Sequence, residues 1–151
     1  MTRHEFIALE QGVGDVLLIA LAAYAWARGG TSERVGAAII IIAWVASWVV
    51  GDSNPATAWI RPQYGVFGVD VLALGAFIAL ALRSDRFWPL TAAGAQLLAV
   101  TVHIGYILDP RKIMPAYISL TSTIGYLILA QTFCGIWFEV HRWRGTERTR
   151  A

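Results

Sequence analysis

Residues 64–108 read YGVFGVDVLALGAFIALALRSDRFWPLTAAGAQLLAVTVHIGYIL, two long apolar runs on either side of a short polar joint. Each run has about the 20 predominantly apolar residues that an α-helix needs to cross a bilayer. The joint, residues 83–87, is short, and a short joint makes two consecutive helices antiparallel neighbours. The stretch therefore predicts a transmembrane helical hairpin.

The same pattern recurs along the whole chain. The five predicted spans cover residues 13–28, 35–50, 64–82, 88–108 and 114–138. Gly29-Gly30 ends the first span and Asp109-Pro110 ends the fourth, because the residue before a proline avoids the helical region. We expect an all-α protein, a single domain over residues 1–151 that forms a bundle of five transmembrane helices and ends in a basic tail, residues 139–151.

Composition agrees with a membrane protein. Hydrophobic residues make up 57% of the 151-residue chain and charged residues only 15%. Soluble domains carry about 25% charged residues. The net charge of +2 does not indicate a nucleic-acid partner, because the basic residues form no patch with interleaved aromatic residues. Lipid is the expected surrounding.

The basic residues predict the orientation. One set of joints carries Arg3, Arg61, Arg111 and Lys112, and the alternate set carries Arg28, Arg34, Arg83, Arg86, Arg142, Arg144, Arg148 and Arg150. Cytoplasmic segments hold the excess of Lys and Arg, so the N-terminus is expected outside and the C-terminus inside a bacterial inner membrane. The tail arginines, Arg142, Arg144, Arg148 and Arg150, are expected to contact anionic lipid.

Aromatic residues at the predicted span ends are expected at the membrane interface, where Trp and Tyr are enriched. This set contains Trp26, Trp59, Tyr64, Trp88, Tyr117, Trp137 and Trp143. Trp44 and Trp48 lie inside the second span, where packing against a neighbour or lipid is expected.

Ionisable side chains within a span are costly and mark candidate functional sites. Asp70 and His103 fall about 9 Å and 8 Å from the outer ends of their helices, at a rise of about 1.5 Å per residue. Because these helices form a hairpin centred near Asp85, the two side chains are expected at nearly equal depth, where a contact is possible. Asp15 is expected near the outer end of the first span, and Gln96 in the drier inner half.

Each of these residues also has a structural interpretation. Asp15 can be satisfied by water and the helix N-terminus, Asp70 can pair within the hairpin, and His103 can be a packed, hydrogen-bonded histidine. Small residues repeat every four positions on two helices and predict close helix packing. These helix-packing candidates are Ala43, Ser47 and Gly51 on the second span and Ala95 and Ala99 on the fourth.

No nucleophile or metal-ligand set accompanies the embedded His and Asp residues, so we expect no catalytic residue, no metal site and no enzymatic activity. Ala99 and His103 have the spacing found in bacteriochlorophyll-binding helices, where a small residue leaves room for a flat macrocycle. This pattern is common in Ala-rich helices. No cofactor is otherwise expected.

Two stretches resemble a group of uncharacterised small polytopic inner-membrane proteins of alphaproteobacteria. The first begins Glu33-Arg-Val-Gly-Ala-Ala, and the second contains Val69-Asp70-Val71, Arg83-Ser-Asp-Arg-Phe-Trp-Pro89, Gln96-Leu97 and Val102-His103. The resemblance covers residues 16–130 and implies the fold and the location. It also implies that Asp70, the turn at 83–89 and His103 belong to a family pattern, but it implies no activity.

Three functions follow as expectations. The first is a non-enzymatic accessory or assembly subunit of a larger membrane complex, bound to other membrane-protein subunits or to itself. The second is a small oligomeric transporter or ion- or proton-handling protein that uses Asp70 and His103. The third is a pigment- or quinone-binding subunit that uses His103.

Overall fold

The computed structural model describes residues 3–51 and 62–148, and it describes the surroundings of the side chains at 12–51, 62–109, 120–138 and 141. All regular structure in these residues is helical. The helices are α1 (Arg3–Arg28), α2 (Thr31–Val50), α3 (Tyr64–Arg83), α4 (Trp88–Leu108) and α5 (Pro110–Arg148). The predicted all-α class is therefore confirmed for the described chain.

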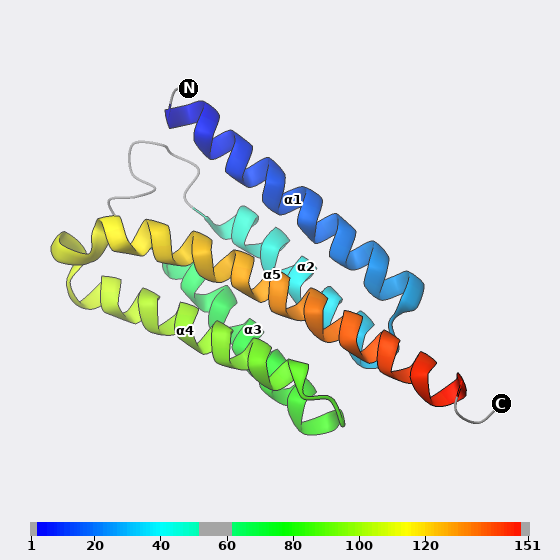
Figure 1. Ribbon diagram of the computed structural model, residues 1–151. Coiled ribbons are helices and arrows are strands. Elements are labelled where there is room, and N and C mark those ends of the chain that lie inside the picture. Colours follow the sequence, from blue (N-terminus) through cyan, green and yellow to red (C-terminus); the bar gives the residue numbers. More distant parts are fainter. Residues whose placement is uncertain (1–2, 52–61, 149–151) are drawn as a thin grey trace.

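Consecutive helices run in opposite directions, and the two termini lie at opposite ends of the bundle (Figure 1). Each helix packs against the next along the chain, and α5 closes the arrangement by packing against α1 and α2. The N-terminus, the end of α2, the start of α3 and the end of α4 share one end of the bundle, which we call the Tyr64 end. Arg28, Arg34, Arg83 and Arg86 lie at the opposite end, which we call the Trp88 end.

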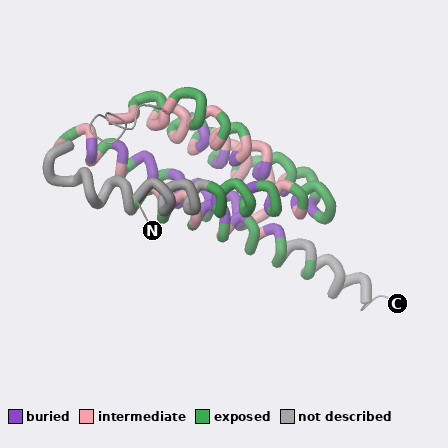
Figure 2. Tube along the Cα trace, turned by 90° about the horizontal axis from the view of Figure 1, so that it is seen from above, coloured by how far each residue is buried: buried purple, intermediate pink, exposed green. Residues whose placement is uncertain are grey.

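Among the described residues, four helical segments are long and apolar enough to cross a membrane. They are Thr31–Val50, Tyr64–Arg83, Trp88–Leu108 and Leu120–Phe138. Exposed positions lie on the outside of the bundle and buried positions on the sides where helices meet (Figure 2). Many exposed side chains are large and apolar, such as Trp48, Leu72 and Leu108 at 72%, 75% and 79% exposure. This distribution suits a bundle whose solvent is lipid.

Two helices extend beyond the predicted membrane spans. α1 begins at Arg3, before the first predicted span, 13–28. α5 runs unbroken from Pro110 to Arg148, beyond both ends of the fifth predicted span, 114–138. Only Asp109 separates α4 from α5, so Arg111 and Lys112 belong to the first turn of a helix rather than to a loop.

The predicted basic tail, 139–151, is likewise helical as far as Arg148. Its sequence lacks an apolar face long enough to predict a helix, but a helix already formed by packing extends at little cost, because propagation is easier than nucleation. At about 1.5 Å per residue the helix is about 58 Å long, well beyond the roughly 30 Å hydrocarbon core. Its last turns extend past the ends of the other helices in Figure 1.

Trp88, at the start of α4, is a core residue rather than an interfacial one. Its side chain is only 6% exposed, which makes the predicted interfacial position wrong. The indole lies between Gly36 of α2 and Gly135 of α5, and a Cβ built on either glycine would overlap it. Trp26, Tyr64 and Trp137 are 52%, 64% and 45% exposed, as expected for interfacial residues.

Replacing Gly36 with alanine is expected to destabilise the protein. The added methyl group overlaps the Trp88 ring, and overpacking a tight core costs about 1–3 kcal/mol. The matched control is Gly94→Ala on α4, because nothing lies within 4 Å of its Cβ position. That control should be neutral or stabilise by up to about 1 kcal/mol, since alanine favours the helix. Unfolding in mixed detergent micelles measures the stabilities of the Gly36→Ala and Gly94→Ala variants. Equal stabilities would contradict the close packing of Gly36 against Trp88.

Candidate functional site

The α3–α4 hairpin brings together two ionisable side chains, the buried His103 and the half-buried Asp70. His103 Nε2 lies 3.0 Å from Asp70 Oδ2, and the exposed fractions of the two side chains are 3% and 19%. The contact that the depth argument predicts is therefore present. At this distance the imidazole and the carboxylate share one hydrogen bond, and either can hold its proton.

Gln96 completes the cluster. Its Nε2 donates to Asp70 Oδ1 over 2.8 Å and to the Asp70 main-chain carbonyl over 3.3 Å. Gln96 lies in the half of α4 nearer Trp88, and its side chain reaches across to Asp70 on α3, a contact that the sequence does not predict. Both carboxylate oxygens of Asp70 are bonded, one to Gln96 and one to His103.

The register of the hairpin explains this cluster. A hairpin centred on Asp85 places position 70 opposite position 100. Gln96 and His103 come four residues before and three after that point, one helical turn on each side, and such positions share a face. The face is buried along its length, with Ala99 and Val100 between the two polar residues. This spacing is the signal in the sequence that identifies Gln96.

An aromatic side chain packs against the cluster. The His103 ring packs against the Phe67 ring, with the centroids 5.9 Å apart and the planes inclined by 51°. Removing charges from water is costly, and the cost is recovered only where the groups are paired and hydrogen-bonded. The Asp70 carboxylate is paired with His103 and hydrogen-bonded to Gln96, as that condition requires. The cluster can therefore hold either a neutral pair or an ion pair.

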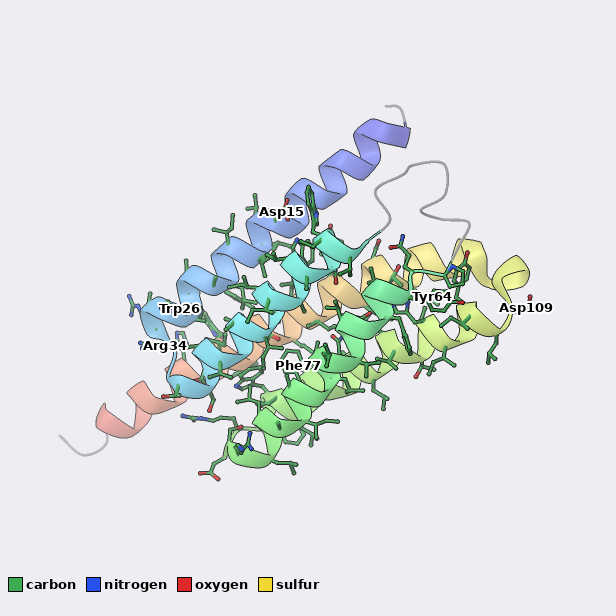
Figure 3. All side chains as sticks on the ribbon, turned by 180° about the vertical axis from the view of Figure 1, so that it is seen from behind. Asp15, Trp26, Arg34, Tyr64, Phe77 and Asp109 are labelled. Atoms are coloured by element: carbon green, nitrogen blue, oxygen red, sulfur yellow. The ribbon has the colours of Figure 1, made fainter. Side chains whose placement is uncertain are left out.

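Asp15 lies elsewhere. It is exposed, and its Oδ1 accepts a hydrogen bond of 3.0 Å from Trp44 Nε1 of α2. Since α1 begins at Arg3, Asp15 lies near the middle of the helix, so the expected position at an outer helix end is wrong (Figure 3). The sequence-based estimate fails because apolar content alone does not show where α1 begins.

A buried carboxylate that the sequence does not predict lies at the Trp88 end. Glu33 is 1% exposed. Its Oε2 accepts the Gly30 N–H over 2.9 Å, and its Oε1 accepts the Trp88 indole N–H over 3.4 Å. Arg86 Nε lies 3.9 Å from the same Oε1. Glu33 thus ties the α1–α2 joint to the α3–α4 joint; a glutamate three residues after a helix N-cap is the local signal for its capping role.

The helix-packing candidates fall in two groups. Ala95 and Ala99 are buried on α4, whereas Ala43, Ser47 and Gly51 are only half-buried on α2. The buried part of α2 lies earlier, at Glu33, Gly36, Ala37 and Ile40. Because a period of four drifts around a helix of 3.6 residues per turn, the second-span repeat does not stay on the buried face.

The remaining predicted site residues are the arginines expected to contact lipid. The side chains of Arg142, Arg144, Arg148 and Arg150 are outside the described residues. Within the described part of the chain, no three His, Cys, Asp or Glu side chains gather as metal ligands would.

Comparison with known proteins gives no relative: no protein-family model, no curated protein and no solved structure matches this chain. The class is therefore defined by the fold alone. The part of the chain that the structure describes is a helical bundle in which four segments are long and apolar enough to cross a membrane, which is compatible with a multi-pass membrane protein.

Proposed function

We propose that this chain is a small proton- or ion-handling protein of the bacterial inner membrane, with Asp70 and His103 as the exchanging groups. The observation that supports this proposal is the 3.0 Å contact between the two side chains, buried within a hairpin of apolar helices. Ionisable residues at such positions are rare in membrane proteins and mark ion pathways and proton relays.

The chemistry requires a group that changes charge near neutral pH, and imidazole is the side chain suited to that range. The Asp70 carboxylate lies within hydrogen-bond distance of this imidazole, and Gln96 fixes the orientation of the carboxylate from the other side. One proton taken up or released at this pair changes the charge within the membrane. Such a change is the elementary step of proton transfer or of ion exchange.

Proton flux into liposomes tests the proposal. Purified protein is reconstituted with an internal pH dye, and a potassium gradient with valinomycin drives protons inward. We expect wild-type protein to acidify the vesicles and Asp70→Asn and His103→Gln to reduce the rate to that of empty vesicles. These substitutions preserve size while removing the exchangeable group.

Thr101→Val is the matched control, because Thr101 is an exposed α4 residue that bonds only to the Leu97 carbonyl of its own helix, over 2.8 Å, among the described contacts. It should transport as wild type does. Wild-type vesicles that acidify no faster than empty ones would refute proton handling, as would equal rates in wild type and both variants.

An accessory or assembly subunit is the second candidate. The observation that favours it is the exposed carboxylate of Asp15, midway along a helix of the bundle. Gentle detergent extraction followed by native gel electrophoresis and mass spectrometry tests this role. A defined assembly with stoichiometric partners would support it, and a band containing only this chain would count against it.

Pigment or quinone binding through His103 is the least favoured candidate. A ligating imidazole needs an accessible ring nitrogen, but Nε2 is engaged with Asp70 and the whole side chain is only 3% exposed. We expect the purified protein to show no visible absorbance band, which a spectrum of the same native band checks.

A further inference from the structure

The exposed Asp15 of α1 indicates an interaction surface that is independent of the Asp70–His103 pair. The buried face of α1 consists of Gly14, Leu18, Leu21 and Ala25. Asp15 lies beside this face rather than on it, next to Val16 and Ile19, which are 65% and 67% exposed. The carboxylate is therefore at the outer surface of the bundle among apolar side chains.

Its depth follows from its partner on α2. Trp44, which donates to Asp15, lies about 20 Å from the Thr31 end of α2 and about 9 Å from the Val50 end, at about 1.5 Å per residue. Since α2 is long and apolar enough to cross a membrane, Asp15 lies alongside a point well inside the hydrocarbon layer.

One indole donor does not satisfy a carboxylate at this depth. A carboxylate has about four sites for hydrogen bonds, and Trp44 is the one partner of Asp15 among the described contacts. Ionisable residues within a span are costly and usually pair with another polar group. The surface around Asp15 therefore favours a partner that brings a donor or a positive charge.

The side chains whose surroundings are described offer no such donor from a second copy. In a two-fold dimer built on this face, the same patch meets itself, so the two Asp15 carboxylates approach each other. Among those side chains, Arg28, Arg34, Arg83 and Arg86 lie at the Trp88 end, and His103 is already paired with Asp70.

We propose that Asp15 and the surrounding face of α1 bind a transmembrane helix of a different protein that carries a lysine or arginine at the matching depth. Gly12, Asp15, Ile19 and Trp26 share this face by their spacing of three, four and seven residues. Nothing lies within 4 Å of the Cβ position of Gly12, so a partner helix can approach the backbone there. Packing and one charge-assisted hydrogen bond hold the two helices together.

The experiment uses the full-length protein in liposomes and two synthetic probe helices. Both probes are leucine–alanine transmembrane peptides with a fluorescent acceptor, one with a central lysine and one with leucine at that position. Energy transfer from labelled protein reports association. We expect the lysine probe to bind wild type about tenfold more tightly than the leucine probe, as one interhelical polar contact of about 1–2 kcal/mol allows.

Variants separate the contact from the fold. Asp15→Leu should bind both probes equally, whereas Trp44→Phe keeps the carboxylate and should retain the preference for lysine. Ile19→Cys in a Cys134→Ala background tests the competing partner, since a disulfide between two copies would assign this face to self-association. Equal binding of both probes to wild type, or that disulfide, would overturn the proposal.

The two proposals fail separately. Asp15→Leu should leave proton flux unchanged, and Asp70→Asn should leave the preference for the lysine probe unchanged. Loss of both properties in either variant would mean that the variant is misfolded. The conservative changes Asp15→Asn and Asp70→Glu are then tested. The preference for the lysine probe must return towards wild type in Asp15→Asn, and the proton flux in Asp70→Glu, or the corresponding proposal is rejected.

Discussion

Trp88→Ala is expected to lower the free energy of unfolding by about 3–5 kcal/mol, the usual cost of deleting a buried large aromatic side chain. The indole is 6% exposed and fills the space that Gly36 and Gly135 leave on two other helices. Neither glycine has a side chain that can move into the cavity. The variant also removes the indole donor of the buried Glu33 carboxylate.

Two comparisons test this assignment. Trp88→Phe keeps most of the ring but removes the N–H donor, so it should cost about 1–3 kcal/mol. Trp48→Ala removes a 72% exposed tryptophan from α2 and should change stability by less than about 0.5 kcal/mol. Unfolding in mixed micelles, followed by circular dichroism, ranks the three. Equal losses for Trp88→Ala and Trp48→Ala would show that Trp88 is not a core residue.

His103→Leu should destabilise the protein by about 3–5 kcal/mol, because removing one partner of a buried pair leaves the other without compensation. Asp70 would keep only its Gln96 bonds in an apolar surrounding. The same unfolding assay measures this loss.

The triple variant in which Asp70, Gln96 and His103 are all leucine should be at least as stable as His103→Leu alone. Apolar residues of similar volume often replace a buried ionic group without loss. Such non-additivity would show that the three side chains act as one cluster. If the triple variant instead loses the sum of three separate costs, the residues are not coupled. In either case the triple variant should carry no proton flux.

The hairpin of α3 and α4 illustrates how much the sequence predicts. The predicted limits of the fourth span, 88–108, match α4, and the third differs by one residue. Short joints and proline positions determine those limits locally. The Asp70–His103 contact is also predictable, because the hairpin register follows from the joint and side chains one turn apart share a face. Gln96 could be predicted by the same register, at the opposite turn.

Other features were not predictable because they depend on distant helices. Trp88 has the sequence position of an interfacial residue, and its burial depends on Gly36 and Gly135 on two other helices. Glu33 has the position of an ordinary capping residue, and its burial depends on the α3–α4 joint. Apolar content also could not show that α1 starts at Arg3, which moves Asp15 from the helix end to the middle.

The sequence by itself determined the helical class, the alternation of helix directions and the pairing of Asp70 with His103, because length, hydropathy and joint size are local properties of the chain. Only the tertiary structure decided the rotation of each helix about its axis. That rotation buries Glu33 and Trp88 and leaves Asp15 exposed, since it is set by how the side chains of all neighbouring helices pack together.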